Sequence, residues 1–290
     1  MDPHEAYVLD TVNRYYAYKK LDRNYNISNK ISLKDDFDEI SPELQGKARN
    51  FEGRFTNPIV SYFAGAYHRE TRGWELMQRG YHAPAGVMSL LQDRYTGHIA
   101  SMRNIGMIAG GLVSSQATAS LFYDYDTELI WYTEGPCPEI QLFKPLKFKY
   151  RKSYDQGTGT GPCSTAMPQT NDSFRQARDE NEGIKRWKYN NLLFRAVLKD
   201  YDTNKERLHP VLTEYQNQLF RLADETNGEE LCRQAQAINR EYIGRALRLA
   251  GEGPLKAGMR FTRYWSKENE ALVEKEDDGE LKELYTRYLR

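Results

Sequence analysis

The sequence predicts a mainly α-helical protein with extended polar segments, and three observations lead to this fold class. Between residues 172 and 251, apolar residues recur every three to four positions in three successive stretches, which is the period of amphipathic helices. Residues 104–123 carry no formal charge and are rich in small side chains. Residues 252–290 combine periodic leucines with dense alternating charge. We therefore expect one transmembrane or buried small-residue helix, a C-terminal three-helix bundle and a charged final helix.

The composition indicates a subunit that other proteins hold in place. The 290 residues include 41 basic and 41 acidic ones, so the chain lacks the basic surplus of nucleic-acid-binding domains. A mean hydropathy of −0.80 is low for a freestanding globule, since little apolar area is left to offset the entropy of ordering. The 21 tyrosines are typical of contact surfaces, although tyrosine also serves as an ordinary amphipathic core residue.

Residues 1–57 are expected to form an N-terminal helix followed by an extended arm. The helix is predicted from apolar residues at helical spacing, Ala6, Leu9, Val12 and Tyr16. Residues 22–57 are polar and show no sustained period, which predicts a stretch wrapped on a partner. The first residues are acidic and precede no apolar run, so we expect neither a signal peptide nor an Arg-rich presequence.

Residues 58–134 are expected to form an aromatic region around a candidate membrane helix at 104–123. At about 1.5 Å per residue, a helix of this length could cross about 30 Å of hydrocarbon. Aromatic residues flank the segment, as in an interfacial belt: Tyr95, Phe122, Tyr123, Tyr125, Trp131 and Tyr132.

The small residues of this segment predict that it packs closely against a neighbouring element. Gly106 and Gly110 form a GxxxG pattern and Gly111 follows, and such residues let two membrane helices approach closely. Gln116 is polar and Leu and Ile are few, so a buried small-residue helix or an irregular core segment is the alternative. In either case we expect Gly106, Gly110 and Gly111 to carry the packing contacts.

Residues 135–171 are expected to be a basic run followed by a Gly/Pro linker. The run from Lys144 to Lys152 reads KPLKFKYRK, and cations of this density beside a membrane bind lipid headgroups. Contact with acidic loops of a partner is the alternative. The GTGTG stretch at 157–161 has the composition of a linker, because it does not match the GxxxxGK(S/T) pattern of a phosphate-binding loop and Pro162 follows it.

Residues 172–251 are expected to form a bundle of three amphipathic helices. Asn227 and Gly228 separate the second helix from the third, and Gly251 ends the third. Residues 252–290 are expected to form a single charged C-terminal helix that is solvated or faces a partner.

Catalytic and metal-binding motifs are not evident in the sequence. The five histidines are scattered and the three cysteines form no CxxC pair, so we expect no metal and no cofactor. Asp124 and Asp126 form a D-x-D, a carboxylate pair able to hold a divalent cation with a nucleotide sugar, or else a plain loop. We expect a protein that is not an enzyme, with a D-x-D transferase as a minor alternative.

One stretch of the second half resembles a known family. Leu193-Phe194-Arg195, with Lys199 following and Phe220-Arg221 in the next helix, is similar to the LYR-motif family of small mitochondrial three-helix proteins. The resemblance covers residues 187–251 and departs at the hallmark, since Phe194 stands where the family has Tyr.

The resemblance to the LYR-motif family also implies which partner proteins the chain would bind. Members of this family serve as accessory subunits or assembly factors of respiratory complexes, and many bind the mitochondrial acyl carrier protein. Here it implies carrier contacts at Arg195 and Lys199, with Phe194 and Phe220 near the acyl channel.

Together these features predict a non-catalytic accessory subunit that supports assembly and stability of an energy-transducing complex of the mitochondrial inner membrane. That complex is the electron transport (respiratory) chain or ATP synthase. The alternative is a soluble scaffold or a filament- or microtubule-associated structural protein of the cytoplasm. Partitioning into membranes separates the two hypotheses.

Overall fold

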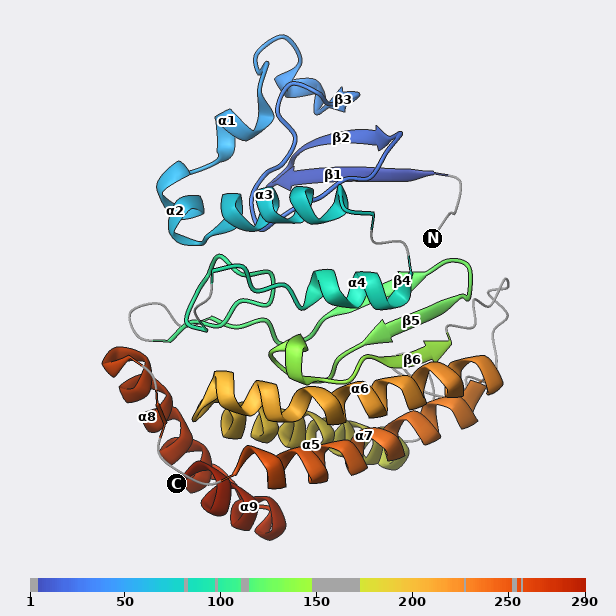
Figure 1. The fold of residues 1–290 in the computed structure, drawn as a ribbon. Helices are drawn as coiled ribbons and strands as arrows, with labels where there is room; N and C mark the ends of the chain where they lie inside the picture. Colours follow the sequence, from blue (N-terminus) through green and yellow to red (C-terminus); the bar gives the residue numbers. More distant parts are fainter. Residues whose placement is uncertain are drawn as a thin grey trace. The chain divides into compact units, whose positions relative to one another are not determined.

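The computed structural model describes residues 5–80, 83–96, 99–110, 115–147, 173–226, 228–251, 255–256 and 258–290. The chain divides into two units, Met1–Ile105 and Gly106–Arg290, which we call the N-terminal and the C-terminal unit and describe separately. The predicted mainly α-helical class is confirmed, and two small three-stranded sheets accompany the helices (Figure 1). The linker expected at 157–171 lies outside the described residues.

The N-terminal unit begins with a β-hairpin, so the helix expected there is wrong. Strands β1 (Ala6–Val12) and β2 (Tyr15–Leu21) pair antiparallel, with Val12 opposite Tyr15. The two-residue turn places Asn13 at φ 55°, a left-handed conformation that Asn tolerates better than most residues. The segment is rich in β-branched and aromatic residues, which favour strands, and alternation buries Val8 and Ala17 on one face.

The polar stretch expected to wrap a partner instead folds back on this hairpin. Short strand β3 (Glu39–Ile40) pairs with β2, and the 3₁₀ helix η1 (Pro42–Leu44) and helix α1 (Phe51–Phe55) follow. A core of six buried residues joins them: Val8, Ala17, Leu33, Ile40, Leu44 and Phe51. The few apolar residues of the stretch are thus enough to anchor it, because the hairpin supplies the other side of the core.

Three further helices complete the N-terminal unit: α2 (Pro58–Phe63), α3 (Ala66–Met77) and α4 (Pro84–Leu91). Lys30 ties α1 to α3, because its buried ammonium lies 3.1 Å from a Glu52 oxygen and 3.0 Å from a Glu70 oxygen. Burial opposes the charge, but hydrogen bonds to Glu70 and Glu52 outweigh it and raise the pKa of Lys30. This lysine therefore remains charged at neutral pH.

The expected helix at 104–123 is also wrong. Ile108 and Gln116 form an antiparallel bridge, and backbone hydrogen bonds join Ala109 N to Ser115 O (2.7 Å) and Ala117 N to Met107 O (2.9 Å). The last residues of the window enter strand β4 (Leu121–Asp124). Glycines cost a helix about 1 kcal/mol each relative to alanine, so this sequence favours the extended pairing. Among the described residues, no helix is both long enough and apolar enough to cross a membrane.

The C-terminal unit is a sheet covered by helices. Strands β4, β5 (Leu129–Tyr132) and β6 (Lys144–Lys147) pair antiparallel in that order, with the 3₁₀ helix η2 (Pro138–Ile140) between the last two. The three expected helices are present as α5 (Ser173–Leu198), α6 (Tyr201–Glu225) and α7 (Gly228–Ala250). Figure 1 shows them below the sheet, and α6 and α7 contact β6. They form a layer on a sheet instead of a separate bundle.

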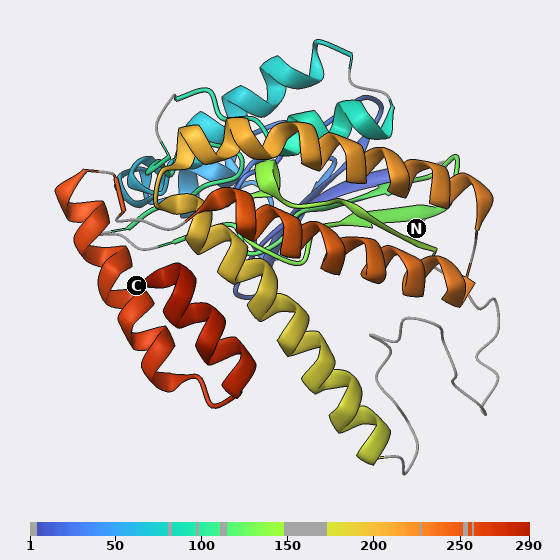
Figure 2. The same cartoon turned by 60° about the horizontal axis from the view of Figure 1, so that its bottom comes forward.

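The charged tail is two helices rather than one. Helix α8 (Met259–Lys275) ends before α9 (Gly279–Leu289), and the Asp278 carboxylate caps α9 by accepting a hydrogen bond from Leu281 N at 3.2 Å. The pair folds back along α5, as Figure 2 shows. Trp265, Leu281 and Tyr285 are buried, so this segment is part of the core and is not a solvated tail.

Candidate functional site

The glycines expected to pack a membrane helix lie in the paired segment that precedes β4. Gly106 is buried, Gly110 is half-buried, and Gly111 lies outside the described residues. A Cβ added at Gly110 would stand 2.8 Å from Trp265 Nε1 and 2.8 Å from Tyr264 Cδ1. Gly110 is therefore closely packed, and the element that it packs against is α8 of the same unit.

Replacing Gly110 by alanine is expected to destabilise the C-terminal unit by about 1–3 kcal/mol, a usual cost of overpacking. Trp265 cannot easily give way, because Phe194, Phe261 and Tyr264 rings surround it. Urea unfolding followed by circular dichroism measures the loss.

The matched control is Gly279→Ala at the first residue of α9, where a Cβ meets nothing within 4 Å. We expect no destabilisation there, because alanine favours a helix more than glycine does. Equal stability of the two variants would contradict the packing role of Gly110.

The residues implied by the LYR-like resemblance face the interior of the C-terminal unit. Phe194, Arg195 and Lys199 are buried. Arg195 donates to Asn269 Oδ1 at 2.7 Å, and its guanidinium lies 5.2 Å from the Trp265 ring centroid. An acyl carrier protein would reach Arg195 only if α8 moved, so this contact stays a prediction.

Phe220, the fourth residue of that set, is half-buried in α6. Its ring centroid lies 5.2 Å from that of Trp131 in strand β5. Trp131 was expected in an interfacial aromatic belt, yet it is buried between sheet and helices. The two side chains thus join α6 to the sheet.

The basic run begins with a lysine that does not face solvent. Lys144 in β6 is fully buried, and its ammonium lies 2.5 Å from Glu134 Oε2 and 4.8 Å from the Tyr132 ring centroid. Lys144 also donates to Gln236 Oε1 of α7 at 3.3 Å. It is therefore unavailable for lipid headgroups, while Lys147 is exposed and residues 148–152 lie outside the described part of the chain.

Burial sets the protonation of this pair. Loss of solvation lowers the pKa of the Lys144 ammonium to about 8, although Glu134 opposes the shift. Burial also acts against the Glu134 carboxylate, but the Lys144 charge outweighs it and holds the pKa of Glu134 below its usual range. Sequence reasoning missed this pair, because Glu134 and Lys144 are joined only by the pairing of neighbouring strands.

A second buried network fixes η2. Tyr201 of α6 donates to Glu139 Oε2, Lys205 Nζ lies 2.5 Å from Glu139 Oε1, and Cys137 Sγ is 3.5 Å from the Tyr201 hydroxyl. The backbone of Cys137 adopts φ 63°, a left-handed conformation that residues other than glycine rarely adopt. The network holds this strained turn against α6 and leaves the thiol buried.

The D-x-D residues close the hairpin between β4 and β5. Asp124 Oδ1 accepts a hydrogen bond from Asp126 N at 3.1 Å, and Oδ2 accepts one from the Thr127 hydroxyl at 2.7 Å. This is the turn-forming use of aspartate. In the part of the chain that the structure describes, no group of three or more His, Cys, Asp or Glu could hold a metal ion.

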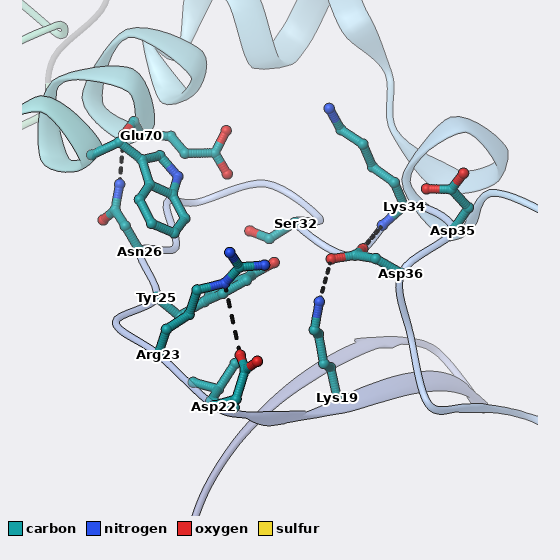
Figure 3. Close-up of a pocket in the computed structure, with 12 residues that line it drawn as sticks. Lys19, Asp22, Arg23, Tyr25, Asn26, Ser32, Lys34, Asp35, Asp36 and Glu70 are labelled. Atoms are coloured by element: carbon teal, nitrogen blue, oxygen red, sulfur yellow. Dashed lines mark hydrogen bonds and ion pairs between the residues drawn. The ribbon is translucent and has the colours of Figure 1, made fainter.

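Two surface features of the N-terminal unit remain that local structure does not explain. Helix α2 exposes four large apolar side chains, Ile59, Val60, Tyr62 and Phe63. A pocket of about 320 Å³ opens between β2, the chain after it and α3 (Figure 3). Sequence reasoning placed residues 58–63 in an aromatic region without an exposed face, because an apolar run alone does not show which side faces solvent.

No family model matches the chain. No solved structure matches it.

Proposed function

We propose that the chain is a non-catalytic subunit of a larger protein assembly and that α2 binds a partner protein. One observation carries the proposal: Ile59, Val60, Tyr62 and Phe63 are between 55% and 71% exposed within one six-residue helix. Each such side chain gains roughly 1.5–3 kcal/mol when fully buried. A contiguous exposed group of this kind marks an interaction surface.

The α2 surface is preformed, which lowers the entropic cost of binding. Asn57 caps the helix by accepting hydrogen bonds from Ile59 N at 3.1 Å and Val60 N at 3.2 Å. Pro58 fixes the first helical position. Because the backbone is already ordered, burial of the side chains contributes more of its free energy to affinity.

A protein partner suits this surface better than a lipid bilayer. The formal net charge of zero gives the chain no long-range attraction to anionic membranes. Aromatic side chains are enriched at the centre of protein interfaces, where they fill apolar pockets. We therefore expect a partner with an apolar groove wide enough for Phe63 and Ile59.

The narrower proposal is an assembly of the mitochondrial inner membrane, either the respiratory chain or ATP synthase. With no membrane helix among the described residues, it rests on the LYR-like resemblance of residues 187–251. Co-purification with an acyl carrier protein tests it directly. A soluble scaffold or filament-associated protein is the competing form of the same proposal.

The experiment compares full-length protein with the double variant Ile59→Ser/Phe63→Ser in the native host. Blue-native electrophoresis is expected to show the wild type in a complex well above 33.8 kDa and the variant at the monomer position. Far-ultraviolet circular dichroism should be unchanged, because both side chains are exposed. Mass spectrometry of the complex then identifies the partners.

The matched control is Ile27→Ser, since Ile27 is 61% exposed in the same unit but outside α2. It should leave the complex intact. A wild-type chain that runs as a monomer, or a double variant that keeps the complex, would contradict the proposal. Flotation of purified wild type with phosphatidylcholine/phosphatidylserine vesicles, lost in the double variant, would assign α2 to lipid instead.

A further inference from the structure

A second binding site is indicated by the pocket of the N-terminal unit, which is separate from the α2 surface. Its volume is about 320 Å³, near the lower end of the range for small-molecule sites. The residues that line it come from β2, the segments 22–26 and 32–36, and α3. All of them belong to one unit, so the pocket does not depend on any other part of the chain.

Ser32 is a polar group in this pocket that lacks a partner. It is only 8% exposed, and its Oγ has no hydrogen-bond partner among the described residues. Its backbone is held firmly, because Asp10 Oδ2 accepts hydrogen bonds from Ser32 N and Leu33 N, both at 2.7 Å. Buried polar groups are normally satisfied, so a buried hydroxyl without a described partner in the wall of a pocket points to a ligand atom.

Two cationic side chains, Arg23 and Lys34, line the pocket together with Ser32. Arg23 and Lys34 are exposed, and their nearest carboxylates are distant, at 3.7 Å for Arg23 to Asp22 and 3.9 Å for Lys34 to Glu52. Figure 3 shows the Arg23 guanidinium beside the Ser32 hydroxyl, while the Lys34 ammonium extends away from Ser32. The loosely paired Arg23 guanidinium, with the Ser32 hydroxyl, suits a carboxylate.

The Glu70 carboxylate supplies a negative charge to the wall of the pocket. Glu70 shares the single Lys30 ammonium with Glu52, so this trio keeps one negative charge. The Glu70 carboxylate lines the pocket, as Figure 3 shows. It can accept a hydrogen bond from a ligand ammonium.

Aromatic rings provide the apolar wall. Tyr25 and Trp74 both line the pocket, with ring centroids 5.8 Å apart in an edge-to-face arrangement. Burial and nearby carboxylates raise the pKa of Tyr25 to about 12, so its hydroxyl remains neutral at physiological pH. The wall suits an aromatic or aliphatic side chain.

We propose that this pocket binds a free α-amino acid with an aromatic or aliphatic side chain. Its carboxylate meets Ser32 and Arg23, its ammonium meets Glu70, and its side chain lies on Tyr25 and Trp74. The mixed lining disfavours a polyanion, since carboxylates stand among the cations. Binding of a small metabolite would add a sensing role to an assembly subunit.

Isothermal titration calorimetry of the full-length protein with L-phenylalanine tests the proposal. We expect saturable binding, and binding at least about tenfold weaker for 3-phenylpropionate and for phenethylamine, each of which lacks one charged group. No heat of binding for L-phenylalanine up to about 10 mM would overturn the proposal. Equal affinity for either single-charge compound would overturn it as well.

Variants locate the site. Ser32→Ala should weaken L-phenylalanine binding about tenfold while the melting temperature of the free protein stays equal or rises, because the lost hydroxyl had no partner among the described residues. Arg23→Gln should weaken binding to a similar extent, and Arg79→Gln, an exposed arginine of the same unit that does not line the pocket, should not. Unchanged affinity in both Ser32→Ala and Arg23→Gln would place the ligand elsewhere and contradict the proposal.

Discussion

Replacing Lys144 by methionine is expected to destabilise the C-terminal unit by about 3 kcal/mol, the low end of the cost of breaking a buried ion pair. The variant leaves the Glu134 carboxylate buried without the ammonium that lies 2.5 Å away. The loss stays at the low end because Arg186 Nε still lies 3.3 Å from Glu134 Oε1 and Gln236 donates to the same oxygen at 3.0 Å. Equilibrium unfolding in urea measures the difference.

Two further variants separate the ion pair from packing. Lys147→Met changes an exposed lysine of the same strand and should stay within about 0.5 kcal/mol of wild type. The double variant Lys144→Met/Glu134→Gln removes both charges and should be more stable than Lys144→Met alone. If the double variant is the less stable of the two, the buried charge is not the cause.

The ion pair also predicts a dependence on pH. The Lys144 ammonium holds the pKa of the Glu134 carboxylate below its usual range, whereas the unfolded chain protonates Glu134 at the ordinary pKa of 4.5. As the pH falls through these values the unfolded state binds more protons, so the wild type loses stability. Lys144→Met lacks the charge that lowers this pKa, so the stability gap between the two should narrow below about pH 5. A gap that stays constant from about pH 7 to 4 would show that Lys144 does not stabilise the Glu134 carboxylate.

Replacing Gly65 by alanine is expected to cost the N-terminal unit about 3 kcal/mol or more. Gly65 adopts φ +69°, which costs other residues roughly 1–2 kcal/mol. In addition, a Cβ would collide with Met102 O and stand 2.8 Å from Met102 C. That carbonyl accepts a hydrogen bond from the buried Arg69 guanidinium, so the backbone has little freedom to move.

Gly46→Ala is the matched control, because Gly46 has a similar φ of +72° but nothing within 4 Å of the added Cβ. It should show only the conformational cost of roughly 1–2 kcal/mol. Hydrogen exchange of the amides in α3, read by mass spectrometry, reports the N-terminal unit separately. Equal losses of stability in the two variants would mean that the backbone around Met102 moves away from the added Cβ with no measurable cost in free energy.

The sequence predicted helices well where the apolar period was long and repeated. Residues 172–251 carry that period through three helices, and α5, α6 and α7 are all present. Over residues 6–16 the same reasoning failed, because a few apolar residues fit helical spacing by coincidence while Asn13 and the β-branched residues favoured a hairpin. The break before α9 had a local signal in Asp278 followed by Gly279, which the charge pattern concealed.

The candidate sites were harder to predict, for different physical reasons. In the uncharged segment 104–123, Ile108 and Gly110 pair or pack inside the C-terminal unit, so missing charge alone did not indicate a membrane. Lys144 looked like a surface cation because no local pattern shows that Glu134 pairs with it across neighbouring strands. Ser32 and Trp74 line the same pocket from distant parts of the sequence, and only the fold places them together.

The central claim is that α2 contacts another protein, and site-specific photo-cross-linking in the native host tests it most directly. The photoreactive residue p-benzoylphenylalanine replaces Phe63 in one strain and Ile27, the exposed control, in another. The account predicts a discrete covalent adduct with one second polypeptide from position 63, its loss on adding Ile59→Ser, and no such adduct from position 27. Only intramolecular products from position 63, or the same adduct from both positions, would contradict it.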